Sequence, residues 1–168
     1  MPHVDFESLP PNARVWVFGA GDVLDDVHSK QLLSIVDEHL SQWRAHGIPL
    51  QCSRDFRDNR FLAVGVDEAA TGASGCSIDG LFRTLTAMLT LLGTSLVGGG
   101  VFFYRDEHGT VQAVDRSAFV ELVKSRAVTA DTQVFDLTID TVGRWRESFE
   151  KRAAESWHAR VLKSALGA

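Results

Sequence analysis

Two long stretches of the chain place apolar residues three and four positions apart, which is the spacing of one face of an α-helix. The stronger stretch is uninterrupted, and its apolar positions are Ile78, Leu81, Phe82, Leu85, Met88, Leu89 and Leu92. The other starts near Asp25, and its apolar positions are Leu32, Leu33, Val36, Leu40 and Trp43. Gly47 followed by Pro49 is a helix stop signal, so we expect this helix to end at Gly47.

Strand patterns surround these helices in the first half of the chain. RVWVF, at 14–18, alternates and is β-branched, and the runs PLQCSRDF and NRFLAVGV are separated by Arg57-Asp58-Asn59, which indicates a hairpin. The predicted order is therefore β-α-β-β-α. This order matches most of a ferredoxin-like split unit, in which two helices cover one face of an antiparallel sheet.

The second half alternates shorter patterns. VFFYRDEHGTVQAV predicts two strands joined by a turn at His108-Gly109, and Asp115 is placed to cap a short helix. ADTQVFDLTI predicts a loop and a strand, and Val142, Trp145 and Phe149 line a last helix. We expect an α+β protein in which a ferredoxin-like core, 1–98, precedes a small β-β-α-β-α part, 99–168; one integrated domain is the alternative.

Composition limits the classes of function. With 168 residues, 45% of them hydrophobic and 23% charged, the chain can bury a sizeable core. The formal net charge of -5 is unlike that of a general nucleic-acid binder. From Arg144 onward, six Lys or Arg accompany three Glu, so a basic end follows an acidic body and favours docking within the chain or to a protein partner.

The start of the chain has no secretory pattern, and no stretch is apolar enough to span a bilayer, so we expect a cytoplasmic protein without a membrane partner. Cys52 and Cys76 are the two cysteines, and they form no CxxC pair. They fit a reducing compartment and predict neither a disulfide framework nor a zinc knuckle.

Nucleotide and metal motifs are missing from the sequence. GAGD, at 19–22, lies between a strand and a helix, but Leu24 stands where a dinucleotide loop has its third glycine, and three aspartates would repel a pyrophosphate. The sequence holds no GxxxxGK[ST] loop, HxxxH pair or HExxH motif. We therefore interpret GAGD as a tight turn and expect no cofactor and no bound metal.

The segment DEAATGASGCSIDG, at 67–80, is a stronger candidate for a functional site than GAGD, because Cys76 lies at the start of the helix with the stronger apolar pattern. A helix N-terminus favours thiolate, and the amides near Ser74, Gly75 and Ser77 could bind an anion, with Asp79 in the same turn. Nearby carboxylates oppose thiolate formation. The alternative is that Cys76 is a small buried side chain in a tight loop.

A nucleophilic cysteine needs a base, normally histidine. Of the six histidines, His158 in ESWHAR is the candidate, because Trp157 could anchor the tail while His158 and Arg160 project beside it. The alternative is an exposed histidine at a basic helix end, where a cation suits the helix dipole.

GASGCSID, at 72–79, and ESWHAR, at 155–160, occur together with PPNARVWVF near the start of the chain. In this combination they resemble a family of small uncharacterised bacterial proteins, some of which are labelled "ABC transporter ATPase". The resemblance implies no established activity. The missing P-loop gives that label no support.

A fainter resemblance covers 101–135, where FFYRDEHGTVQAV, FVELVKS and TADTQVF follow one another. This order is similar to GYF-like interaction domains. The Gly-Pro of that family is absent from the second strand, and Arg126 stands where the family has a glycine after the helix. With these departures, the resemblance implies mainly a structural likeness to the family.

Two classes of function follow from these patterns. The first is a non-catalytic interaction or regulatory module that binds a protein partner. The alternative is a thiol-dependent enzyme, or a protein that binds a small anion, at Cys76 and the start of its helix.

Overall fold

The structure is a computed structural model that describes residues 4–45, 47–68 and 75–167. It has an α+β fold, as predicted, and its two larger sheets are antiparallel. The chain forms two compact units: a first unit, Met1–Val97 with Thr138–Arg146, and a second unit, Gly98–Leu137 with Glu147–Ala168. Residues 138–146 thus group with the first unit, although the predicted division placed them in the second part.

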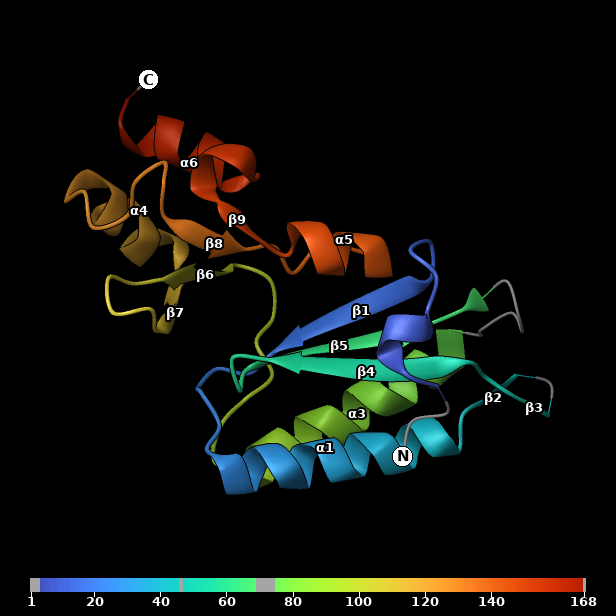
Figure 1. Ribbon diagram of the computed structural model, residues 1–168. Helices are drawn as coiled ribbons and strands as arrows, with labels where there is room; N and C mark the ends of the chain where they lie inside the picture. Colours follow the sequence, from blue (N-terminus) through green and yellow to red (C-terminus); the bar gives the residue numbers. More distant parts are fainter. Residues whose placement is uncertain (1–3, 46, 69–74, 168) are drawn as a thin grey trace. The chain divides into compact units, whose positions relative to one another are not determined.

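The first unit is a three-stranded sheet with two helices on one face (Figure 1). Its strand order is β1-β5-β4, and the strands are β1 (Arg14–Gly19), β4 (Cys52–Arg57) and β5 (Phe61–Val66). The helices are α1 (Asp26–Ser41) and α3 (Gly75–Leu91), and the 3-10 helix η1 (Phe6–Ser8) precedes the sheet. β5 is antiparallel to both neighbours, so β1 and β4 run in the same direction.

Strand β5 is buried along its whole length because both of its faces are covered. On one face, Leu62, Val64 and Val66 belong to the core formed with α1 and α3. On the other face, a Cβ added at Gly65 would lie 2.7 Å from Leu9. Burial on both faces explains why this strand is a continuous apolar run rather than an alternating one.

The hairpin of β4 and β5 confirms the predicted turn at residues 57–59. Asp58 and Asn59 have φ values of 53° and 49°, in the left-handed region, which aspartate and asparagine tolerate better than most residues. The turn pairs Arg57 with Phe61 and sets the register of the hairpin.

The predicted end of the first helix is wrong. α1 ends at Ser41, and a two-stranded ribbon follows, in which β2 (Arg44–Ala45) pairs with β3 (Ile48–Pro49). Gly47, with a φ of 80°, serves the turn of this ribbon. A glycine stop signal does not distinguish a helix end from a tight turn that follows the helix closely.

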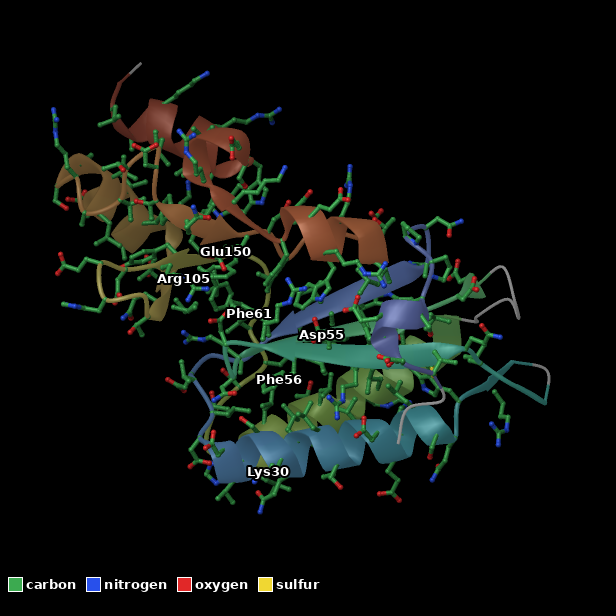
Figure 2. The ribbon with its side chains drawn as sticks, in the orientation of Figure 1. Lys30, Asp55, Phe56, Phe61, Arg105 and Glu150 are labelled. Atoms are coloured by element: carbon green, nitrogen blue, oxygen red, sulfur yellow. The ribbon has the colours of Figure 1, made fainter. Side chains whose placement is uncertain are left out.

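Residues 138–146 are fixed to the first unit by polar contacts. The indole nitrogen of Trp145 donates a hydrogen bond to Asp55 at 2.7 Å, and the Arg57 guanidinium lies 4.3 Å from the Trp145 ring (Figure 2 labels Asp55). The amide of Val15 donates to the Asp140 carbonyl at 2.9 Å. Helix α5 (Val142–Ser148) begins in this segment.

The second unit is a four-stranded sheet of order β7-β6-β8-β9 with helices at its side. The strands are β6 (Val101–Arg105), β7 (Val111–Asp115), β8 (Gln133–Phe135) and β9 (Glu150–Arg152). The helices are α4 (Arg116–Lys124), the 3-10 helix η2 (Ala153–Glu155) and α6 (His158–Ala165). Its core joins strand residues such as Phe102 and Val134 to Phe119 of α4 and Leu162 of α6.

Two charged side chains lie across this sheet. Arg105 of β6 and Glu150 of β9 form a bidentate ion pair, with contacts of 3.0 and 2.7 Å, over the intervening strand β8 (Figure 2). The Arg105 guanidinium also lies 5.2 Å from the centre of the Phe135 ring. A bidentate pair of this kind fixes the relative positions of its strands better than a single contact does.

The predictions for the second half are confirmed for β6, β7, β8 and α4. Asp115 caps α4, because its carboxylate accepts a hydrogen bond from the Ala118 amide at 2.8 Å. The β-β-α-β-α order omitted β9 and α6. A complete ferredoxin-like fold would add a fourth strand to the first sheet, so that finer assignment stays a prediction.

Candidate binding site

The predicted site at the head of α3 is described only in part. Ser74 lies outside the described residues, and so do the side chains of Cys76 and Ser77. The backbone is helical from Gly75, and Asp79 is exposed. Gly75, Cys76, Ser77 and Asp79 therefore share the first turns of one helix, and their roles in binding stay predictions.

His158 is fully buried at the start of α6. Its ring stacks on Trp157 with centroids 3.7 Å apart, and the rings of Phe102 and Phe119 lie 5.8 and 5.9 Å away. Its Nδ1 forms a hydrogen bond of 2.8 Å with the Ser156 hydroxyl. The expectation of an exposed histidine is wrong, because the imidazole fills a space among aromatic rings.

Burial also sets the charge of His158. Desolvation lowers the pKa of the imidazole to about 4, and the opposing influence of Asp136 is smaller. The Nε2 atom is buried and has no hydrogen-bond partner among the described residues. His158 is thus a neutral core residue near pH 7, whereas Arg160, two residues further along α6, is exposed.

The proposed pairing of Cys76 with His158 stays a prediction. Cys76 belongs to the first unit and His158 to the second, and each unit is described by itself. His158 has no exposed surface from which it could accept a proton from a thiol.

The other cysteine is a core residue. Cys52 is fully buried at the start of β4, and its thiol contacts the Leu40 carbonyl at 3.6 Å. Burial raises the pKa of this thiol to about 11, so Cys52 is protonated at neutral pH and unreactive as a nucleophile.

The GAGD segment is a structural turn. The buried guanidinium of Arg60 donates a hydrogen bond to the Ala20 carbonyl at 3.0 Å and another to the Gly21 carbonyl. Desolvation lowers the pKa of Arg60, and nearby Asp22 opposes this effect. A loop whose carbonyls hold a cation is the reverse of a phosphate loop, in which amides face the ligand.

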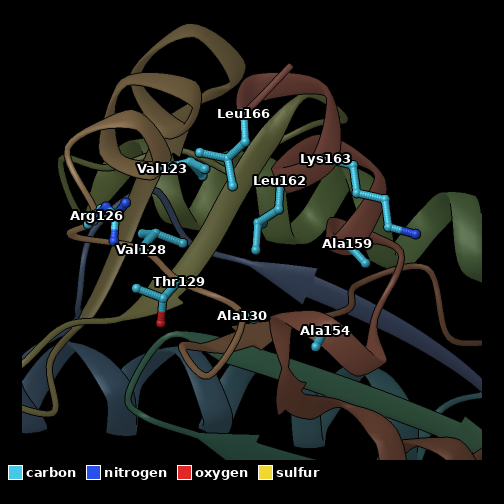
Figure 3. Close-up of a pocket in the computed structure, with 10 residues that line it drawn as sticks. All are labelled: Val123, Arg126, Val128, Thr129, Ala130, Ala154, Ala159, Leu162, Lys163 and Leu166. Atoms are coloured by element: carbon cyan, nitrogen blue, oxygen red, sulfur yellow. The ribbon is translucent and has the colours of Figure 1, made fainter. Parts of the chain in front are cut away.

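A hollow of about 500 Å³ lies between the end of α4 and helix α6 in the second unit (Figure 3). Its apolar lining comes from α4, the loop after α4, η2, and α6 with its C-cap residue, and consists of Val123, Val128, Ala130, Ala154, Ala159, Leu162 and Leu166. Thr129, Arg126 and Lys163 complete the lining. The volume lies within the range of about 300–1,000 Å³ that is typical of ligand sites.

Small and exposed side chains keep this hollow open. Ala130, Ala154 and Ala159 occupy little of the space that larger side chains would fill. Leu166 is 63% exposed, so the apolar surface continues from the hollow to its mouth. An exposed leucine beside an apolar hollow is a feature of binding surfaces rather than of a closed core.

Arg126 holds an unusual backbone conformation at the edge of the hollow. It follows the C-cap residue of α4, Ser125, and its φ is 64°, in the left-handed region. Its amide donates to the Val123 carbonyl at 3.1 Å, which closes the helix. Glycine is the residue preferred here, and a long side chain in this conformation costs about 1–3 kcal/mol.

The two cations of the hollow make no ion pair with a described residue. Figure 3 shows Arg126 and Lys163 on opposite sides of the hollow, with Leu162 between them. The carboxylates of the surrounding segments are engaged elsewhere: Asp131 and Glu155 contact Arg152 at 2.7 and 4.0 Å, and Glu121 contacts Lys124. The rim of the hollow is therefore positive in a chain of net charge -5.

Among the described residues, no group of three or more His, Cys, Asp and Glu side chains could hold a metal ion. None of the helices in that part of the chain combines the length and apolar character that a bilayer span requires.

No protein-family model matches the chain, and neither a curated protein nor a solved structure matches it. The functional interpretation therefore depends on the chain's own residues. The sequence patterns did not predict the hollow, although they include two signals that belong to it: Arg126 in place of a glycine after the helix, and a basic end of the chain that contains Lys163.

Proposed function

We propose that the second unit is a non-catalytic binding module whose hollow receives apolar side chains of a protein partner. The observation that carries this proposal is the hollow itself, which combines a ligand-sized volume, an apolar lining and a cationic rim. A few anchor side chains buried in pockets account for most of the affinity in many protein interfaces, and the rim around them is polar.

The chemistry of the described residues supports a role without catalysis. His158 is buried and neutral, and Cys52 is buried and protonated, so neither offers a reactive group to a ligand in solution. The residues that line the hollow include no cysteine, histidine or carboxylate. The lining also holds the Thr129 hydroxyl and the Lys163 amine, and it places no histidine or carboxylate beside them to act as the base that an activated nucleophile needs.

The alternative, a thiol-dependent enzyme or an anion-binding protein at the start of α3, depends on Cys76 together with Ser74, Gly75, Ser77 and Asp79. It stays a prediction. We retain as proposals the ferredoxin-like interpretation of the first unit and the GYF-like interpretation of 101–135, since the strand orders β1-β5-β4 and β7-β6 are compatible with them.

A titration with tert-butanol, followed in ¹H–¹³C methyl spectra, tests whether the hollow binds apolar groups. We expect saturable shifts of the methyl signals of Val123, Val128, Leu162 and Leu166, because this small alcohol gathers where apolar surface is concave. Methyl groups buried in the first unit, such as those of Val64, serve as internal references.

The substitution Ala159→Trp fills the hollow and is expected to abolish these shifts. Ala118→Trp is the matched control, because Ala118 is exposed on α4 and does not line the hollow. Equal shifts in wild type and Ala159→Trp, or shifts spread evenly over surface methyls, would refute a binding role for the hollow.

A further inference from the structure

We infer that the partner of the hollow is an acidic amphipathic helix of another protein, which places its apolar face in the hollow and its carboxylates against Arg126 and Lys163. This inference rests on the proposed function and adds the chemistry of the partner.

The rim supplies the first argument, which is charge complementarity. Arg126 and Lys163 approach the hollow from opposite sides and have no anionic partner among the described residues. Helix α6 also carries Arg160 and has no acidic residue. A partner with aspartate or glutamate beside its apolar anchors would pair with these cations, whereas a basic segment would be repelled.

The backbone around the hollow supplies the second argument, which concerns the partner's conformation. The lining amides already donate within the unit: that of Val128 to Leu122, that of Ala154 to Ala130 and that of Leu166 to Leu162, at 3.0–3.1 Å. None of the described lining residues belongs to a β-strand, so an extended peptide finds no strand edge there to which it could add by backbone hydrogen bonds.

A partner that contributes only side chains must satisfy its own backbone hydrogen bonds, and an α-helix does so. Apolar side chains at spacings of three and four lie on one face of such a helix, and several of them fit a hollow of about 500 Å³. Glutamates next to this face then reach the cations on either side.

Arg126 supplies the third argument. Its left-handed backbone would suit a glycine, yet the chain keeps a long cationic side chain there, on the wall of the hollow. Asp58 and Asn59, which share this conformation, are residue types that tolerate it. Strained positions of this kind are characteristic of ligand clamps, so binding explains the arginine at this site.

Isothermal titration of the full chain with three designed peptides tests this inference. Each probe is an 18-residue, acetylated and amidated helical peptide with the same leucine face, and the residues beside that face are glutamate, glutamine or lysine. At 50 mM NaCl we expect the glutamate peptide to bind at least tenfold more tightly than the glutamine peptide. We expect the lysine peptide to bind least and the preference to shrink at 300 mM NaCl.

Variants of the protein that lack the cations of the hollow complement the change of charge on the peptides. Lys163→Gln and the double variant Arg126→Gln with Lys163→Gln are expected to lower the affinity for the glutamate peptide, the double variant by about tenfold, and to leave the glutamine peptide unaffected. Arg116→Gln is the control, because Arg116 is exposed at the opposite end of α4 and does not line the hollow. Circular dichroism verifies that each variant is folded.

The outcomes separate this inference from the proposed function. If tert-butanol shifts the methyls of the hollow but the glutamate peptide binds no better than the other two, the inference is overturned and the proposed function stands. Saturable binding of decanoate with no peptide binding would assign the hollow to a small amphiphile and would also overturn it. If neither tert-butanol nor any peptide binds, the proposed function itself fails.

Discussion

At the scale of single residues, His158 and Arg126 occupy positions that lower stability. The imidazole of His158 leaves a buried nitrogen without a partner among the described residues, which costs about 1–3 kcal/mol. Arg126 adopts a left-handed backbone that favours glycine. His158 and Arg126 differ in the interactions that offset this loss of stability. Packing of aromatic rings surrounds His158, whereas the Arg126 side chain lines an open hollow.

The buried imidazole predicts how the stability of the chain depends on pH. Its pKa is about 4 in the folded chain and ordinarily 6.5, so between these values the unfolded chain binds more protons than the folded one. The contribution of His158 to stability is therefore fully present above about pH 6.5 and is lost as the pH falls towards 4. The maximum loss is about 3 kcal/mol, measured as the free energy of unfolding in urea across this range.

Replacing the imidazole isolates the contribution of His158 to the pH dependence of stability. His158→Phe keeps an aromatic ring beside Phe102 and Phe119 and removes the titrating group, so its stability curve between pH 4 and 6.5 is expected to be flatter than that of wild type. His28→Gln, at a half-exposed histidine on α1, serves as the control. Parallel curves for wild type and His158→Phe would contradict the assignment.

At the scale of elements, the sequence predicts the helices and strands that have a long apolar pattern or a characteristic turn sequence. Helix α3 holds six of the seven apolar positions of its predicted stripe, and the β4–β5 hairpin has an Asp-Asn turn. Strand β9 has three residues, Glu-Lys-Arg, and shows no apolar alternation, because its contribution lies in backbone pairing with β8. Helix α6 has eight residues, too few for a repeated apolar pattern.

Glycine at position 65 is required by the double-sided packing of β5. We expect Gly65→Ala to lower the free energy of unfolding by about 1–3 kcal/mol, because the new methyl group would lie 2.7 Å from Leu9 and 3.2 Å from Val142. Urea denaturation measures the loss. Gly98→Ala is the control, since a Cβ there meets no atom within 4 Å.

The substitution Leu9→Ala tests the cause of that loss. In combination with Gly65→Ala it removes the atom that the new methyl group meets, so the double variant is expected to lose less stability than the sum of the two single variants. Strict additivity of the two losses would show that the contact with Leu9 is not responsible.

At the scale of the whole molecule, the candidate site was beyond the reach of sequence patterns because it is assembled from distant segments. Residues 123–130 and 154–166 line the hollow, and neither segment carries a binding motif by itself. The composition shows that the segment from Arg144 onward is basic although the chain as a whole is acidic, and Lys163 of this segment lines the hollow. Helix packing, which brings α4 and α6 together, decides where this charge acts.

If the second unit is the binding unit, Arg126 is the residue at which the requirements of stability and of binding oppose each other. Glycine adopts a φ of 64° without strain but has no side chain to offer an acidic partner. A substitution to glycine at this position should therefore change the two properties in opposite directions, which a purely structural role for the arginine would not produce.

The most direct test is therefore Arg126→Gly, with stability measured in urea and affinity for the glutamate peptide measured by titration calorimetry. We expect the free energy of unfolding to rise by up to about 1 kcal/mol while the affinity falls at least threefold. An affinity equal to that of wild type, together with unchanged or increased stability, would contradict the claim that the hollow binds an acidic partner through Arg126.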